Sequence, residues 1–167
     1  MKLARKSRFV RAWKQLRRWR HYASVGYETI AFLYRSDRNL RFMKYGCAAQ
    51  TEEPDTVNPG EPKAERYARQ LYHYAASAIP LKEKHRLEIG SSRGSGASYV
   101  QRAFGLRSTV GTDFSRQVIA FCRRVYQVED FSFQVGNAMR LPVSAERFNV
   151  VTNIESSHTY PSLDFFS

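Results

Sequence analysis

The sequence predicts an α/β fold in which helices flank a parallel sheet. Two observations lead to this prediction: strand and helix patterns alternate from residue 85 onward, and a glycine-rich segment directly follows the first strand. Ligands of such sheets bind beyond the carboxyl ends of the strands, so we expect residues with chemical roles directly after each strand. At 167 residues, the chain has the length of one domain with a hydrophobic core.

The chain begins with a strongly basic segment. Residues 1–24 contain nine Lys or Arg and no Asp or Glu, which leaves +3 of the net charge of +12 to all other residues. Phe9, Trp13 and Leu16 recur at helical spacing, and this predicts an amphipathic helix suited to an anionic membrane surface. Nucleic acid is a less favoured partner. The same composition also fits an organelle transit peptide or a solvated helix without a specific partner.

The next segments connect this basic start to the main domain. Residues 25–34 are apolar and aromatic and are predicted to form a helix. Residues 51–62 contain three prolines, one glycine and four acids, which predicts a surface loop. The main domain should begin with a helix whose apolar stripe runs up to Pro80. We therefore divide the chain into an N-terminal helical appendage at 1–50, a linker at 51–62 and the main domain at 63–167.

The main domain then alternates between strands and helices. Strands are predicted at "HRLEIG", "STVGTD", "FSFQVG" and "RFNVVTNI", which begin at residues 85, 108, 131 and 147. Helices are predicted at residues 95–104 and 115–126, the second of them capped by Ser115. Strands that alternate with helices in this way pair in parallel.

The segment "LEIGSSRGSGASYV", residues 87–100, could hold either of two cofactors. Its glycines allow a tight turn from strand to helix and a close approach of the backbone to a ligand. Asp113 ends the second strand and is placed to bind ribose hydroxyls, which nicotinamide cofactors and S-adenosylmethionine both carry. A short-chain dehydrogenase also needs Tyr-x-x-x-Lys, and no tyrosine of this chain has a lysine four residues later. The nicotinamide cofactor is therefore disfavoured.

Further motifs resemble those of the class I S-adenosylmethionine-dependent methyltransferases. From Glu88 the glycine segment looks like that family's first motif, E-x-G-x-S-x-G, and "GNAMRLPVSAERFNVV" at 136–151 resembles its Gly-Asp-Ala-x-x-Leu-Pro followed by Phe-Asp-x-Val. "GSGASYV", "IAFCRRVY" and "NIESSHTYP" also resemble the mycobacterial phthiotriol and phenolphthiotriol dimycocerosate methyltransferases. The resemblance implies a Rossmann-like sheet, S-adenosylmethionine as the cofactor, and a hydroxyl group of a lipid or similar hydrophobic molecule as the methyl acceptor.

The resemblance also implies the site residues. The cofactor would be held by residues that follow the first four strands or end them: Glu88, Gly90, Ser92, Gly94, Asp113, Phe114, Asn137, Ala138 and Asn153. His158 would be the general base that removes the acceptor proton, with Glu155 beside it. Purely structural roles would be a tight turn without a ligand for the glycine loop and backbone hydrogen bonding for the histidine. Ser92, Asn137 and Asn149 depart from the family's usual residues, which predicts weaker cofactor binding.

The family's sheet has seven strands, whereas the sequence supplies patterns for four. We therefore expect a methyltransferase domain without its C-terminal part, with little activity of its own and with the fourth strand as an exposed edge. Two other functions fit the sequence less well: an inactive cofactor-binding relic and a basic membrane-surface module.

The remaining features concern cysteines and targeting. Cys47 and Cys122 show no metal-ligand spacing, so neither a metal site nor a disulfide is predicted. The sequence shows no secretory signal and no apolar run of membrane-spanning length, so we expect a cytoplasmic location, peripheral at the membrane. The oligomeric state is left open.

Overall fold

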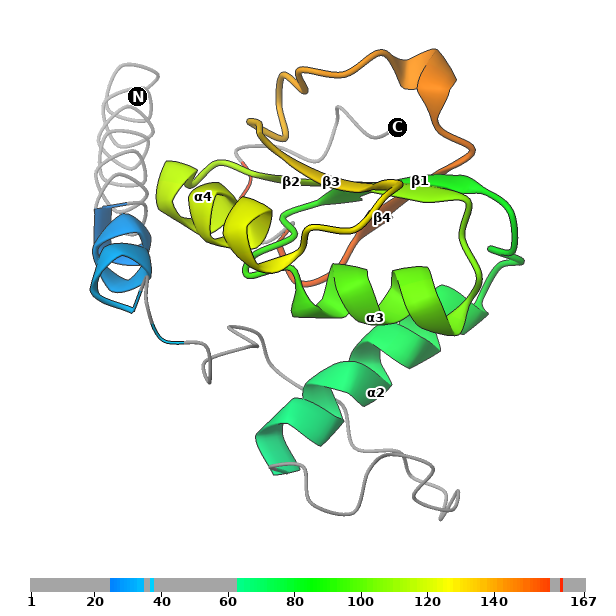
Figure 1. The fold of residues 1–167 in the computed structure, drawn as a ribbon, viewed down its shortest axis with the longest axis horizontal. Helices are drawn as coiled ribbons and strands as arrows, with labels where there is room; N and C mark the ends of the chain where they lie inside the picture. The colour runs from blue at the N-terminus through cyan, green and yellow to red at the C-terminus, as the bar shows by residue number, and fades with distance from the viewer. Residues whose placement is uncertain (1–24, 35–36, 38–62, 157–159, 161–167) are drawn as a thin grey trace, which may run out of the picture.

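A computed structural model describes residues 25–34, 37, 63–156 and 160. The predicted basic helix of residues 1–24, the linker at 51–62 and His158 lie outside these residues. Within the described part, the predicted fold is confirmed: four strands form one parallel sheet with helices packed beside it (Figure 1).

The sheet has the strand order β3-β2-β1-β4, and each neighbouring pair is parallel. The strands are β1 (His85–Ile89), β2 (Ser108–Asp113), β3 (Phe131–Val135) and β4 (Val150–Asn153). Strands β1 to β3 extend the sheet in one direction, and β4 then pairs with the other side of β1. The strand order therefore reverses between β1 and β4, which is where sheets of this type bind their ligands.

Three labelled helices pack beside the sheet: α2 (Lys63–Ser77), α3 (Ser95–Ala103) and α4 (Arg116–Val125). Helix α3 starts after the glycine loop, and its N-cap residue Gly94 has a φ of 78°, which glycine adopts without strain. Helix α4 starts as predicted, because the Ser115 side chain accepts a hydrogen bond of 3.2 Å from the Val118 N–H. None of the described helices is long and apolar enough to cross a membrane.

Strand β4 is shorter than the predicted 147–154 segment. Residues Ala145–Arg147 form one 3₁₀ turn, so the strand starts only at Val150. Asn149 joins this turn to β1: its N–H donates to the His85 carbonyl at 2.9 Å, and its Oδ1 accepts from the His85 N–H at 3.0 Å. Among the described strands β4 lies at the sheet edge, and its Val151 is 56% exposed.

The first residues that the structure describes pack against the hydrophobic core. Residues 25–33 form a helix that lies beside α4 (Figure 1). We refer to it as the 25–33 helix. Its Ala31 is 2% exposed and packs in a cluster with residues of α3, α4 and β3: Ala97, Val118, Ile119, Phe121, Cys122, Phe131 and Phe133. This part of the predicted appendage is therefore packed against the main domain.

Gly96 permits close packing between α3 and α2. A Cβ atom at this position would overlap the ring of Tyr72, which is 1% exposed. We expect Gly96→Ala to lower the free energy of unfolding by about 1–3 kcal/mol, because the buried ring has no room to move. Urea denaturation followed by circular dichroism measures the change.

Gly26→Ala is the matched control for this prediction. Gly26 lies in the 25–33 helix, and an added Cβ would meet no atom within 4 Å. We expect this variant to keep or raise the stability, because alanine is the better helix former. Equal stability of Gly96→Ala and the wild-type chain would contradict the tight contact between α2 and α3.

Candidate functional site

The loop after β1 folds back against the end of β2. The backbone N–H groups of Gly90 and Ser91 both donate to the Thr112 carbonyl at 2.8 Å. Gly90 has a φ of 73°, and Ser92 has a φ of 48° although it carries a side chain. Left-handed backbone is unfavourable by roughly 1–2 kcal/mol for a residue other than glycine, so the loop holds Ser92 against an intrinsic preference.

Asp113 connects this glycine loop to α4. Its carboxylate accepts hydrogen bonds of 3.0 Å from the backbone N–H groups of Ser92 and Ser115, and the residue is 5% exposed. Asp113 thus lies at the carboxyl end of β2, as the proposed ribose ligand requires. The next residue, Phe114, is 47% exposed and so is available to a flat ligand.

Tyr27 reaches this region from the 25–33 helix, and it is absent from the set of site residues predicted from the sequence. Its hydroxyl donates to the Ser92 Oγ at 3.3 Å, and its ring centroid lies 5.3 Å from that of Phe114. Burial, followed by the negative charge of Asp113, raises the pKa of the Tyr27 phenol. The phenol therefore remains protonated at neutral pH and acts as a hydrogen-bond donor. Only the tertiary contacts show this role, because Tyr27 belongs to no recognisable motif.

Arg93 of the glycine loop holds the end of the same helix. The residue is 1% exposed, and its guanidinium donates to the Tyr34 carbonyl at 3.0 Å and to the carbonyl of Asp37. The guanidinium carbon also lies 3.7 Å from the ring centroid of Phe121 on α4. The loop, the 25–33 helix and α4 are therefore joined through one buried side chain.

Glu88 is fully buried and forms an ion pair with Arg86. Both side chains are 0% exposed, and Arg86 Nη2 donates to Glu88 Oε2 at 2.9 Å and to the Ala97 carbonyl at 3.2 Å. Burial and the nearby charge and hydrogen bond of Glu88 raise the pKa of the Tyr72 phenol. Residues two apart in a strand share one face, so the sequence contained a signal for the pairing of Arg86 with Glu88.

The second carboxylate oxygen of Glu88 is notable. Oε1 is buried and has no hydrogen-bond partner among the described residues. A buried carboxylate oxygen without a partner is energetically unfavourable, and it suits a ligand that brings a positively charged donor. The same holds for Oε2 of Glu155, which is also buried without a partner in the described structure.

Three side chains at the end of β4 and after it form a ring of hydrogen bonds. Asn153 Nδ2 donates to the Tyr160 hydroxyl at 3.1 Å, and the Ser156 hydroxyl donates to Asn153 Oδ1 at 2.5 Å or to the Ile89 carbonyl at 3.2 Å. The Ser156 and Tyr160 oxygens are 2.7 Å apart. Since the single proton of Ser156 is used elsewhere, Tyr160 donates to Ser156. We call these three residues the hydroxyl ring.

The hydroxyl ring lies directly on the glycine loop. A Cβ atom on Gly90 would overlap the Ser156 side chain and lie 3.8 Å from the Tyr160 hydroxyl oxygen. Burial raises the pKa of Tyr160, which keeps its phenol protonated. The sequence predicted Asn153 in this site but not Ser156 or Tyr160. Their role depends on how the loop folds back over β1, which no spacing rule predicts.

The other predicted site residues are placed less centrally. Asn137 is exposed, and its Oδ1 accepts from the Met139 N–H at 2.9 Å, so it stabilises its own turn. Ala138 packs at the edge of the cluster formed by residues of β1 and β2. Glu155 has a φ of 61°, and its negative charge is one of the causes that raise the pKa of Tyr72 on α2.

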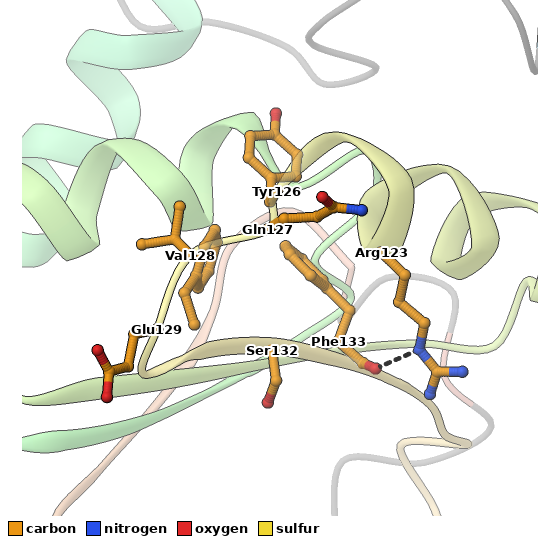
Figure 2. A pocket seen from close by; sticks show the side chains of 8 residues that line it. Arg123, Tyr126, Gln127, Val128, Glu129, Ser132 and Phe133 are labelled. Atoms are coloured by element: carbon orange, nitrogen blue, oxygen red, sulfur yellow. Dashed lines mark hydrogen bonds between the residues drawn. The ribbon is translucent and has the colours of Figure 1, made fainter.

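A separate cavity of about 310 Å³ lies between the end of α4 and β3 (Figure 2). Figure 2 shows Arg123 at its rim, where the Nε donates to the Phe133 carbonyl at 2.9 Å. The lining includes Val128 and Glu129, which precede β3, so the cavity lies toward the amino end of that strand and away from the candidate site. No group of three or more His, Cys, Asp or Glu in the described part of the chain could hold a metal ion.

Comparisons with known proteins identify the type of domain. Residues 87–165 match the family described as "Methyltransferase domain". The chain is 35% identical over 156 residues to the fatty-acid O-methyltransferase of Mycolicibacterium smegmatis, an alignment that covers 89% of this chain and 56% of the relative. It is 38% identical over 120 residues to the phthiotriol/phenolphthiotriol dimycocerosates methyltransferase of Mycobacterium leprae, with 71% and 44% covered. The chain spans about half the length of these curated relatives.

Solved structures agree on the fold. Geranyl diphosphate C-methyltransferase from Streptomyces coelicolor A3(2), in complex with Mg²⁺, geranyl diphosphate and S-adenosyl-L-homocysteine, superposes with a TM-score of 0.59. The two chains are 15% identical, and the match covers 80% of this chain and 55% of the other. The predicted Rossmann-like arrangement of strands and helices is thereby confirmed.

The buried pair of Arg86 and Glu88 predicts a stability effect. Glu88→Gln removes the counter-charge and leaves a buried guanidinium, so we expect the free energy of unfolding to fall by about 3–5 kcal/mol. The double variant Arg86→Met, Glu88→Leu removes both charges and should regain most of this loss. Urea denaturation of both variants tests the prediction.

The control for this experiment is Glu129→Gln, which changes an exposed acid at a distance from the pair. Its stability should stay within about 0.5 kcal/mol of the wild-type value. If Glu88→Gln unfolds at the same urea concentration as this control, the ion pair does not stabilise the fold in the way that its burial indicates.

Proposed function

Since this chain belongs to the class I S-adenosylmethionine-dependent methyltransferases, we propose that it transfers a methyl group from S-adenosylmethionine to an oxygen atom of a lipid or similarly hydrophobic acceptor. The observation that supports this most directly is the convergence of three features at the carboxyl ends of neighbouring strands. These are the glycine loop after β1, the carboxylate of Asp113 after β2 and the hydroxyl ring after β4.

The residues of the loops fit S-adenosylmethionine, the cofactor of the family. The unpartnered Glu88 Oε1 suits the ammonium group of the methionine part, because it is an anionic oxygen already desolvated beside the glycine loop. Asp113 would accept the ribose hydroxyls, and Phe114 together with Tyr27 would flank the adenine. The cofactor supplies an electrophilic methyl group bound to a positively charged sulfur.

The acceptor class follows from chemistry and from the relatives. The matched relatives are named for fatty acids and for dimycocerosate lipids, which supports a lipid acceptor here. An alcohol must lose its proton as the new carbon–oxygen bond forms, so it needs a base, for which His158 and Glu155 are our candidates. A carboxylic acid such as a Glu side chain has a pKa of about 4.3. The carboxyl group of a fatty acid is therefore already ionised at pH 7 and needs no base.

The location is part of the proposal. We infer that the protein acts in the cytoplasm at the surface of a membrane, where a lipid acceptor is present. The nine basic side chains of residues 1–24 would provide attraction to anionic lipids, at about 1 kcal/mol for each one near the surface. A charged interaction of this type weakens as the salt concentration rises.

Asp113 provides the test of cofactor binding. A hydrogen bond to a charged group contributes about 1.5–3 kcal/mol, so Asp113→Ala should weaken binding of S-adenosylhomocysteine roughly ten- to a hundredfold. Isothermal titration calorimetry measures the affinity, and thermal unfolding shows whether the variant still folds. Asp113→Asn keeps one acceptor oxygen, so its affinity for S-adenosylhomocysteine should lie between those of the wild-type chain and Asp113→Ala. Glu129→Ala is the control, and unchanged affinity in Asp113→Ala would remove the ribose assignment.

Methyl transfer needs its own measurement. We expect purified protein to move a labelled methyl group from S-adenosylmethionine to a long-chain fatty acid or a long-chain alcohol. The rate of methyl transfer to an alcohol should rise with pH through about 6.5, and it should be lost in His158→Ala. The rate of transfer to a fatty acid should not change with pH above about pH 6. Binding of S-adenosylhomocysteine without transfer to either acceptor would contradict the enzymatic proposal and favour a cofactor-binding protein without activity.

A further inference from the structure

The 25–33 helix has two faces of different character. Its inner face carries Tyr27 and Ala31, which contact Ser92 and the core cluster around Phe121. Apart from the half-buried Glu28, its remaining large side chains are apolar and exposed: Val25 (50%), Ile30 (45%), Phe32 (48%) and Leu33 (67%), followed by Tyr34 (47%). Five exposed apolar side chains within ten residues form a patch of the kind that marks an interaction site. We call this patch the outer face of the helix.

The charges around the outer face are strongly asymmetric. Residues 1–44 contain 13 of the 27 Lys and Arg of the chain and only two acids, Glu28 and Asp37. The net charge of this part is therefore +11, out of +12 for the whole chain. Residues 25–34 contain no basic side chain, so along the sequence the basic residues precede and follow this apolar segment.

This combination matches the boundary of an anionic bilayer. Interfacial helices place apolar side chains at the level of the lipid headgroups while flanking Lys and Arg contact the anionic groups. A nucleic acid would instead require basic side chains on the contacting helix, because the phosphates dominate the affinity. The outer face carries none, and its exposed area is aliphatic and aromatic.

We propose that the outer face of the 25–33 helix, with Tyr34, docks onto the surface of an anionic lipid bilayer. The inner face of the same helix contacts the glycine loop through Tyr27 and is held there by Arg93. Docking would therefore leave the cofactor-binding loops one helix diameter, roughly 10 Å, from the lipid surface. The inference extends the membrane contact proposed for residues 1–24 to a described surface, and it requires neither cofactor nor methyl transfer.

A groove beside the helix adds a physical reason for this orientation. A groove of about 500 Å³ lies between part of the helix and the start of α4. It is lined by Val25, Glu28, Thr29, Phe32, Phe114 and Gln117. It is continuous with the outer face through Val25 and Phe32, and it reaches Phe114 next to Asp113. A bilayer in contact with the outer face would therefore adjoin the rim of the candidate site.

The experiment uses the full chain and vesicles of phosphatidylglycerol mixed with phosphatidylcholine. The double variant Ile30→Gln, Leu33→Gln removes two exposed apolar groups and keeps residues with good helix propensity. We expect at least tenfold weaker co-sedimentation with anionic vesicles, because transfer of each of these side chains out of water is favourable. Val128→Gln, which changes a valine that is 62% exposed near β3, is the matched control and should bind like the wild-type chain.

Further measurements separate this proposal from the proposed function. Leu33→Phe keeps an apolar side chain and should retain vesicle binding. The double variant should unfold at the wild-type temperature and bind S-adenosylhomocysteine as the wild-type chain does, since both side chains belong to the outer face rather than to the candidate site. Lack of methyl transfer by the wild-type chain would leave the vesicle result standing.

Three outcomes would overturn the proposal. The first is equal binding of the double variant and the wild-type chain to anionic vesicles. The second is equal binding of the wild-type chain to vesicles of phosphatidylcholine alone. The third is tighter binding to a DNA duplex than to anionic vesicles, with no effect of the double variant, which would identify the basic residues as a nucleic acid interface.

Discussion

The carboxylate of Asp113 holds the candidate site together. It accepts the N–H of Ser92 on one side and the N–H of Ser115 on the other, so one side chain fixes the glycine loop against the start of α4. Ser92 in turn bonds Tyr27 through its hydroxyl, which brings in the 25–33 helix. Because a carboxylate has about four acceptor positions, it can hold two loops and still be the kind of group that binds a diol. The same group can therefore serve both the fold and the ligand.

A second constraint is the burial of charge in β1. Glu88 and Arg86 are both removed from water, and such a pair is unfavourable unless its geometry and hydrogen bonds are good. Arg86 Nη2 donates to Glu88 Oε2 and to the Ala97 carbonyl, but Glu88 Oε1 and the other two nitrogens of Arg86 lack partners among the described residues. A buried charge that is only partly compensated fits a site whose ligand supplies the remaining donor. Tyr72, whose ring packs tightly on Gly96, is buried in the same region.

Much of the fold could be predicted, because it rests on local patterns. The strands at 85, 108 and 131 follow from short strand-like runs that alternate with helical patterns, and the cap at Ser115 follows from one hydroxyl at the right position. The site could be predicted only in part. Its motif residues are local, whereas the residues that the sequence did not predict are Arg86 and three that act through contacts between distant segments, Tyr27, Ser156 and Tyr160. Only Arg86 had a local signal, since it shares a strand face with Glu88. The start of β4 was placed too early, because "RFN" looks like strand, whereas Arg147 ends the 3₁₀ turn and Asn149 links to β1 through its side chain.

The three departures from the family's usual residues, Ser92, Asn137 and Asn149, have distinct structural roles. Ser92 adopts the left-handed conformation that glycine would adopt, and its hydroxyl gains the bond from Tyr27 in return. Asn149 uses its amide oxygen to hold the N–H of His85, a bond that an aspartate could also make. Asn137 directs its amide oxygen to the N–H of Met139, so it stabilises the turn after β3. Each residue thus satisfies a backbone group or a neighbouring side chain. The weaker cofactor binding that the departures predict therefore concerns Asn137 most, because its acceptor oxygen is already used within its own loop.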